Sequence, residues 1–270
     1  MSRIQAAFER LKKERRPAFI PYVMAGDPDL STTRKIVLEL ARQGADLVEL
    51  GVPFSDPLAD GPVIQRAAAR ALESGTTIAG IFRLVRDLRR ETQVPIVLMT
   101  YYNPVLQHGL ERTVRDARRS GADGFIIPDL TPEEAGPWRK VLRGTGIDFI
   151  CLAAPTTPPD RLKTLDRVSS GFLYYVSLTG VTGAKLAAEP ELRSQVGRVR
   201  RAVSLPVAVG FGIKSPAQAA QVGAFADGVI VGSALVSRIE SAGRRKAAAS
   251  AGRFAKAVSL KLRANRVKSK

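Results

Sequence analysis

Short apolar runs alternate with amphipathic segments along most of the 270 residues of the chain. Runs rich in Val, Ile and Leu are typical of buried strands, whereas apolar residues spaced near 3.6 are typical of helices packed on one face. The pattern predicts eight strands with a helix between each consecutive pair. The expected strands are residues 18–23, 47–52, 95–100, 124–128, 147–152, 171–176, 206–210 and 228–232.

Glycine and aspartate mark the boundaries where a predicted helix ends and the next predicted strand begins. Residues 44–46, 121–123 and 223–227 each end a helical pattern with glycine and begin an apolar run after aspartate. We expect Ser31 to cap the helix after the first strand and Gly44 to end it. A further helical pattern covers residues 4–11. The long interval between the second and third strands has room for two helices, at 62–73 and 77–90.

Eight strands that alternate with helices predict an α/β fold, a (β/α)8 TIM barrel. We expect residues 1–270 to form a single domain with an extra N-terminal helix. The structural alternative is a doubly wound open sheet, which would carry a dinucleotide-binding fingerprint after an early strand. The only candidate, residues 210–215, lacks the third glycine and comes late in the chain. The barrel is therefore favoured.

The chain is strongly basic, with 42 Lys and Arg against 25 Asp and Glu and a net charge of +17. Ten of the basic residues lie within 244–270 without an acidic residue, which predicts a basic C-terminal helix or tail within the domain. Such a stretch can bind nucleic acid or an anionic surface, but a solvated helix face is the simpler interpretation. No RNA-binding or zinc-finger motif accompanies it. Neither nucleic acid nor a membrane is an expected partner.

The single cysteine and the single histidine narrow the possible chemistry. Cys151 excludes an internal disulfide, suits a reducing cytoplasm, and lies in an apolar run that indicates a core position. With His108 alone, no metal site built from several histidines can form, so we expect no metal and assign His108 a loop or cap role. No apolar run approaches membrane-spanning length and no signal peptide is recognised, so a cytoplasmic location is expected.

Two carboxylates stand in unusual contexts. Glu49 lies within the apolar run 47–52, where a buried charge costs several kcal/mol unless it is partnered or functional, and such a group can both give and take a proton. Asp60 lies on a loop rich in proline and glycine that can fold over the end of the strand carrying Glu49. The simpler alternatives are an ion pair for Glu49 and a turn role for Asp60.

Glycines follow the last three predicted strands. Gly180 and Gly183 follow the sixth strand, Gly210 and Gly212 the seventh, and Gly232-Ser233 the eighth, where a helix begins. Glycine lets the backbone approach an anion closely, and a helix N-terminus adds a favourable dipole. Because barrels often bind phosphate at these loops, the pattern predicts a small phosphorylated ligand.

The order and spacing of these motifs resemble the tryptophan synthase alpha chain. The resemblance extends from about residue 17 to about residue 240 and is carried by four stretches, 22–28, 53–62, 180–183 and 210–213. It implies a cofactor-free lyase of tryptophan biosynthesis that cleaves indole-3-glycerol phosphate to indole and D-glyceraldehyde 3-phosphate by a retro-aldol reaction. It also implies an α2β2 complex, in which the beta chain consumes the indole and alone holds pyridoxal phosphate.

The resemblance assigns roles to residues of this chain. Glu49 would serve both proton transfers, and Asp60 would stabilise positive charge at the indole nitrogen and accept its proton. Leu178 departs from the arginine that some members carry, so no contact of that arginine is expected here. The other implied site residues are Tyr174 and Thr182 as supporting groups, Gly183, Gly212, Gly232 and Ser233 at the phosphate, and Tyr22, Met99, Ile126, Ile150 and Phe211 around the indole.

Three function classes follow: the lyase subunit of a tryptophan synthase, a free-standing lyase that releases indole, and an anion-binding protein that only keeps the barrel. Retention of Glu49 and Asp60 argues against the third class, because a binding protein needs neither. The first two classes differ in partner loops, which a single sequence does not resolve. In either case we expect loops 53–62 and 179–189 to close over the substrate, with Thr182 bonding Asp60.

Overall fold

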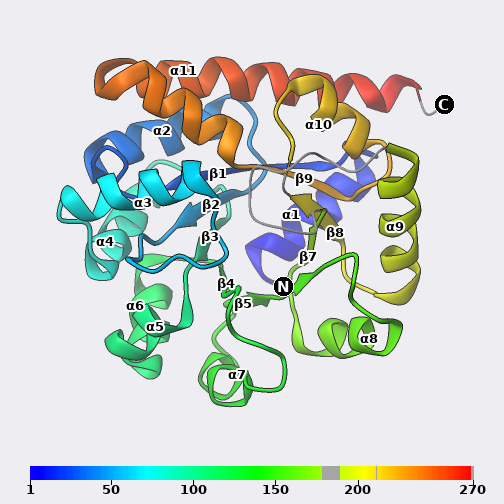
Figure 1. The fold of residues 1–270 in the computed structure, drawn as a ribbon, viewed down its shortest axis with the longest axis horizontal. Helices are drawn as coiled ribbons and strands as arrows, with labels where there is room; N and C mark the ends of the chain where they lie inside the picture. Colours follow the sequence, from blue (N-terminus) through cyan, green and yellow to red (C-terminus); the bar gives the residue numbers. More distant parts are fainter. Residues whose placement is uncertain (178–188, 211, 269–270) are drawn as a thin grey trace.

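Parallel strands form a barrel with helices around it in the computed structural model of the chain (Figure 1). The structure describes residues 1–177, 189–210 and 212–268, and for residues 265–268 it describes the backbone alone. All neighbouring strand pairs are parallel, in the order β5-β4-β3-β2-β1-β9-β8-β7-β6. The strands are β1 (Ala18–Met24), β2 (Val48–Gly51), β3 (Ile96–Met99), β4 (Gly124–Ile126), β5 (Asp148–Ile150), β6 (Leu152–Ala153), β7 (Leu173–Val176), β8 (Val207–Gly210) and β9 (Gly228–Val231).

The eight predicted strands are confirmed, and the fifth is divided in two. β5 pairs with β4, and β6 pairs with β7, with only Cys151 between the two pieces. The Cys151 carbonyl accepts a hydrogen bond from the Tyr174 backbone N–H at 3.0 Å. The two pieces stand at the two ends of the strand order, so this one strand pairs with β4 through its first part and with β7 through its second. The nine segments therefore make a nearly closed eight-position barrel, as predicted.

Helices follow the strands along the chain and cover the outside of the barrel (Figure 1). They are α1 (Arg3–Lys13), α2 (Leu30–Arg42), α3 (Pro62–Glu73), α4 (Ile78–Leu88), α5 (Tyr102–His108), α6 (Leu110–Ser120), α7 (Gly136–Leu142), α8 (Pro159–Val168), α9 (Glu189–Ala202), α10 (Pro216–Gly223) and α11 (Ser233–Lys268). In the described part of the chain, no helix is long and apolar enough to cross a membrane.

The cap of α2 differs from the prediction. Asp29, not Ser31, is the N-cap, because its carboxylate accepts the Thr32 backbone N–H at 2.8 Å while Ser31 lies inside the first turn. A carboxylate is also favoured there by the helix dipole. At the other end α2 stops at Arg42, and Gly44 adopts a φ of 95° that suits glycine.

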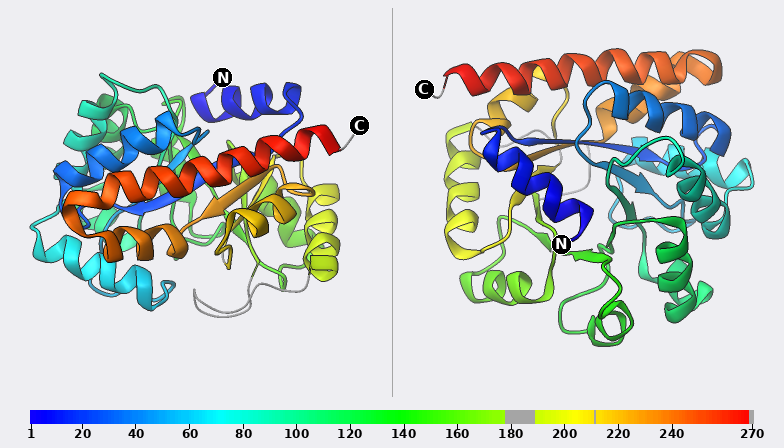
Figure 2. Two further views of the ribbon diagram at one scale, coloured as in Figure 1. Left: turned by 90° about the horizontal axis from the view of Figure 1, so that it is seen from above. Right: turned by 180° about the vertical axis from the view of Figure 1, so that it is seen from behind.

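The helix α1 closes the amino end of the barrel, where it lies across the strands in the view from behind (Figure 2). Its residues Ile4, Phe8 and Leu11 belong to the apolar cluster inside the barrel, and the Phe8 ring lies 5.6 Å from that of Phe172. A second, larger cluster fills the layer between strands and outer helices. Since α1 blocks the amino end, a ligand can reach the barrel interior only from the carboxyl end.

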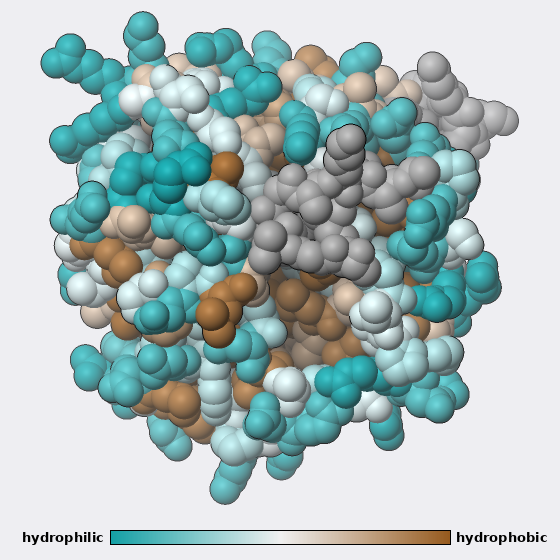
Figure 3. Space-filling model, viewed as in Figure 1, coloured by the Kyte–Doolittle hydropathy of each residue, from teal (hydrophilic) through white to brown (hydrophobic). Residues whose placement is uncertain are grey.

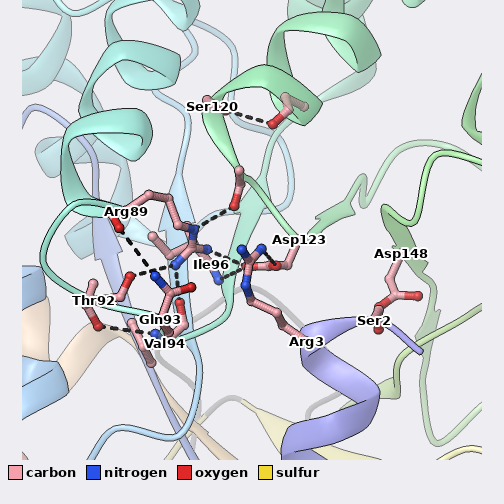
Figure 4. A network of polar contacts seen from close by, with 12 residues as sticks. Ser2, Arg3, Arg89, Thr92, Gln93, Val94, Ile96, Ser120, Asp123 and Asp148 are labelled. Carbon is pink, nitrogen blue, oxygen red and sulfur yellow. Dashed lines mark hydrogen bonds and ion pairs between the residues drawn. The ribbon is translucent and has the colours of Figure 1, made fainter.

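An aspartate just before β4 links two strands at the amino end of the barrel (Figure 4). Asp123 accepts the backbone N–H of Ile96 in β3 at 2.7 Å, and its carboxylate is also bonded by Arg89 and Arg3. The carboxylate is buried, so these partners offset the cost of removing its charge from water.

The same arrangement recurs at two other strand pairs. Asp46, before β2, accepts the Phe19 backbone N–H at 2.9 Å and is paired with Arg16. Asp227, before β9, accepts the Val207 backbone N–H at 3.0 Å. We call Asp46, Asp123 and Asp227 the strand clasps. They satisfy strand N–H groups that have no ladder partner at the barrel end.

The basic C-terminal segment is the second part of α11, beyond the non-helical Gly243. Its buried face, which includes Ala251, Ala255 and Val258, belongs to the outer apolar cluster, and α11 packs along α2 (Figure 1). The basic side chains between residues 244 and 263 are exposed. This arrangement agrees with a solvated basic helix face.

Cys151 occupies the core position expected for it, whereas His108, expected in a loop or cap, is the last residue of α5, and Gly109 is the C-cap. Cys151 is buried, and burial raises the pKa of its thiol, which makes it a poor nucleophile. His108 ends α5, and its Nε2 lies 3.0 Å from Oδ2 of Asp116 in α6. His108 thus links two consecutive helices.

Candidate active site

A cleft opens at the carboxyl end of the barrel, on the face shown in Figure 3, where apolar side chains gather around a central hollow. The cleft contains about 580 Å³ of empty space when the part open to solvent is included. Its described lining comes from loops and strand ends on both sides of the barrel. The lining residues are Tyr22, Glu49, Asp60, Ile64, Met99, Tyr174, Gly212, Ile213, Lys214, Ile230, Gly232, Ser233 and Ala234.

Glu49 projects from β2 into this cleft. It is in register with Tyr22 of β1 and Val97 of β3, and its side chain is only 1% exposed. Among the described residues, none forms a hydrogen bond with either carboxylate oxygen. Burial, and secondarily the charge of Asp60, raise the pKa of Glu49 to about 8. Glu49 is therefore mostly protonated at neutral pH and can act as an acid.

Asp60 reaches the cleft from the loop between β2 and α3. Pro62 is the first residue of α3, and Gly61 is its N-cap, so the start of this helix fixes one end of the loop. The Tyr101 hydroxyl lies 3.1 Å from Asp60 Oδ2. Burial raises the pKa of Asp60 to about 6, although the hydrogen bond from Tyr101 lowers it. At neutral pH Asp60 is mostly ionised, in contrast to Glu49.

Two buried tyrosines stand beside these carboxyls because glycines make room for them. A Cβ on Gly51 would lie 2.1 Å from the Tyr22 hydroxyl oxygen, and a Cβ on Gly210 would lie 2.2 Å from that of Tyr174. Burial, followed by the nearby carboxylates, raises the pKa of both phenols, so both remain protonated. Gly210, which the sequence grouped with the phosphate loop, thus accommodates a tyrosine ring.

The predicted phosphate-binding residues Gly212, Gly232 and Ser233 all line the cleft. Ser233 begins α11, as expected, and Gly212 has a φ of 77°. The first N–H groups of a helix have no partner within it and attract anions. This side of the cleft is suited to a phosphate. Gly183 and Thr182 lie outside the described residues.

The predicted indole-binding residues divide into two groups. Tyr22 and Met99 line the cleft. Ile126 and Ile150 are fully buried in the cluster inside the barrel, which also contains Tyr174, so they support the floor of the site from below. Phe211 lies outside the part of the chain that the structure describes.

Sequence reasoning missed several residues of the site. Ile64, Ile230 and Lys214 line the cleft without a sequence signal of their own. Tyr101 bonds Asp60, and its position immediately beyond the predicted third strand is a signal that could have found it, because barrel sites form where strands end.

These features define a class of protein: a (β/α)8 barrel with two titratable carboxyl groups in a cleft at the carboxyl ends of its strands, which is where enzymes of this fold have their active sites. Among the described residues, no group of three or more His, Cys, Asp or Glu side chains could hold a metal ion. Comparison with known proteins identifies the family. A family model described as tryptophan synthase alpha chain matches residues 8–265. The chain is 49% identical over 240 residues to the tryptophan synthase alpha chain of Geotalea daltonii, an alignment that covers 89% of this chain and 91% of that one.

Solved structures agree with the sequence match. The tryptophan synthase subunit alpha of Legionella pneumophila superposes with a TM-score of 0.91 at 40% identity, over 97% of this chain and 98% of that one. A chain of the tryptophan synthase complex of Pyrococcus furiosus superposes with a TM-score of 0.81 at 36% identity, over 90% and 98%.

The chain belongs to the tryptophan synthase alpha chain family, as its motifs predicted. It is a lyase subunit that cleaves indole-3-glycerol phosphate in tryptophan biosynthesis. A beta-chain partner fits this family, since a tryptophan synthase complex is among the similar structures.

Proposed function

We propose that Glu49 and Asp60 are the catalytic acid–base pair of this lyase. The observation that carries the proposal is their opposite protonation at neutral pH: the pKa of Glu49 is raised to about 8, whereas that of Asp60 is about 6. Two neighbouring carboxyls with separated pKa values can act as acid and base in one site. Both groups line the same cleft.

Glu49 would start the reaction by protonating C3 of the indole ring. The resulting positive charge spreads to the indole nitrogen, where ionised Asp60 would accept the N–H and stabilise it. Glu49, now ionised, would then remove the proton of the side-chain hydroxyl. As the aldehyde C=O forms, the carbon–carbon bond breaks and its electrons return to the ring, which leaves indole and D-glyceraldehyde 3-phosphate.

Gly212, Gly232 and Ser233 would hold the substrate phosphate, and Tyr22 and Met99 would contact the indole, as their places in the cleft suggest. Replacing Gly212 with valine should weaken substrate binding, because a branched side chain at φ 77° disturbs the backbone that approaches the anion. Competition by inorganic phosphate measures this directly. An unchanged substrate KM and an unchanged phosphate inhibition constant would remove Gly212 from the phosphate site.

The remaining parts of the proposal concern assembly and location. The reaction as written needs only acid–base groups, so we propose that this chain uses no cofactor and that pyridoxal phosphate is held by the beta chain. We also propose an α2β2 complex in the cytoplasm. Analytical ultracentrifugation with the cognate beta chain tests the stoichiometry, and lyase kinetics with and without that chain test whether pairing raises activity.

Single-turnover release of indole tests the catalytic pair. Asp60→Asn should slow the release of indole by ~10²-fold or more, because the variant lacks the negative charge that would stabilise the indole cation. Asp56→Asn is a matched control, because Asp56 is exposed on the same loop. The assignment of Asp60 fails if the two variants release indole at similar rates.

A further inference from the structure

Tyr101 contacts the Asp60 loop at three places. It lies two residues beyond β3 and is only 7% exposed. Its hydroxyl oxygen lies 2.9 Å from the Ala59 backbone nitrogen and 3.1 Å from Asp60 Oδ2, and its ring lies 5.4 Å from that of Phe54. One side chain on a strand end therefore contacts both ends of the segment between Phe54 and Asp60.

The direction of the two hydrogen bonds follows from their chemistry. A backbone N–H can only donate, so the Tyr101 oxygen accepts from Ala59. Its own proton is then free to point at Asp60 Oδ2. Burial, followed by the charge of Asp60, raises the pKa of Tyr101 above its usual range, so the phenol keeps this proton. A donor aimed at a carboxylate makes a charge-assisted bond that favours the ionised form.

The rest of the loop offers Asp60 little support. Ser55, Asp56, Leu58 and Ala59 are exposed. Gln65 binds the Asp60 backbone carbonyl at 2.8 Å but not its carboxylate. Within residues 1–177, 189–210 and 212–268, Tyr101 is the side chain whose hydrogen bond reaches that carboxylate.

From these contacts we infer that Tyr101 is a positioning residue, which holds Asp60 ionised and directed at the substrate by fixing the Asp60 loop to the end of β3. The inference rests on the proposed role of Asp60. It adds a residue that touches no reacting atom and acts only through Asp60.

The hydrogen bond from Tyr101 lowers the pKa of Asp60, whereas burial raises it. Removing this hydrogen bond should therefore change the pH at which Asp60 gains a proton. The titratable groups that face Asp60 or its loop are Glu49 from β2, Tyr22 from β1, Tyr174 from β7, Tyr101 after β3, Lys214 after β8 and Asp56 of the loop itself. Asp129, after β4, lies near Tyr101.

Tyr101→Phe tests the inference, since it keeps the ring against Phe54 and removes only the hydroxyl. Without the donor the pKa of Asp60 rises, so the acid limb of the kcat/KM profile should move up by about one pH unit, with a roughly tenfold loss of kcat/KM on that limb. Tyr102→Phe is the matched control, because it removes a hydroxyl from the next residue and should leave the limb in place. In an Asp60→Asn background, Tyr101→Phe should have little further effect.

A second variant covers the case in which Tyr101→Phe folds poorly. Tyr101→3-fluorotyrosine keeps the hydroxyl and makes it a stronger donor, so the acid limb should move to lower pH. Acid limbs that coincide for the parent and either variant would overturn the inference while leaving the role of Asp60 intact. Failure of the proposed function is distinguishable, because then Asp60→Asn itself would release indole at the parent rate.

Discussion

Replacing Glu49 with glutamine tests two properties of this residue, its role in catalysis and the loss of protein stability that its burial causes. The amide side chain would have nearly the same shape as the carboxyl group but could neither donate an acidic proton to C3 nor accept one from the hydroxyl. Loss of a proton-transfer group costs ~10²–10⁴ in rate, and the upper end applies when one group serves two transfers. We therefore expect a nearly inactive Glu49→Gln variant whose cleft still binds the phosphate.

The same variant should be more stable than the parent above acidic pH. The pKa of Glu49 rises from 4.5 to about 8 on folding, so the folded chain binds a proton that the unfolded chain releases. Well below pH 4.5 this raised pKa leaves the free energy of unfolding unchanged, and it lowers that free energy increasingly as the pH rises toward 8. At 1.36 kcal/mol per pH unit, the cost is under ~1 kcal/mol at pH 5, about 3 at pH 7 and about 5 at pH 9.

Urea unfolding at these three pH values measures the effect. The unfolding free energy of Glu49→Gln minus that of the parent should grow by these amounts from pH 5 to pH 9. Glu73→Gln is a matched control, because Glu73 is exposed at the end of α3. A stability difference that stays flat across pH would refute the buried, neutral state of Glu49, and an active variant would refute its proton transfers.

Three further outcomes follow from the structure. The kcat/KM profile should be bell-shaped. It should fall below about pH 6 as Asp60 gains a proton and above about pH 8 as Glu49 loses one, and a kcat/KM that keeps rising past pH 9 would contradict this order. Gly210→Ala should displace the Tyr174 ring, since the new Cβ would lie 2.2 Å from its hydroxyl, and should lower indole release more than tenfold; an unchanged rate would show that the ring can shift without consequence. Asp123→Ala should lower the unfolding free energy by roughly 3–5 kcal/mol, because it leaves Arg89, whose side chain is only 11% exposed, without its carboxylate, while kcat at 25 °C stays at the parent value. A loss below about 1 kcal/mol would contradict the pairing.

Most of the barrel could be predicted because its signals are local. Each strand is an apolar run between turn residues, and in the helices apolar residues recur at a spacing near 3.6. The eight strand positions could therefore be predicted without knowledge of tertiary contacts. The break at Cys151 could not be predicted, because it depends on which neighbouring strand each part of this strand pairs with. The cap of α2 was misplaced because Asp29 and Ser31 are both good capping residues, and the path of the backbone decides between them.

The site was predictable to a smaller extent. Glu49 was identified because a charge inside an apolar strand conflicts with local rules, which is a sign of function. Tyr101 and Lys214 conflict with no local rule. Tyr101 stands just beyond a predicted strand, which marks it as a candidate, but its contact with Asp60 depends on which strand ends and loops meet in space. The same is true of Lys214, and only the folded chain shows these contacts.

The strand clasps bear on how the barrel assembles. Each clasp joins an aspartate to the N–H of the strand just before it in the chain, across 27, 27 and 20 residues for Asp46, Asp123 and Asp227. Closing such short loops costs little chain entropy, whereas pairing β1 with β9 must bring distant parts of the chain together. We expect the strand–helix–strand units to form one at a time during folding and the pairing of β1 with β9 to form last.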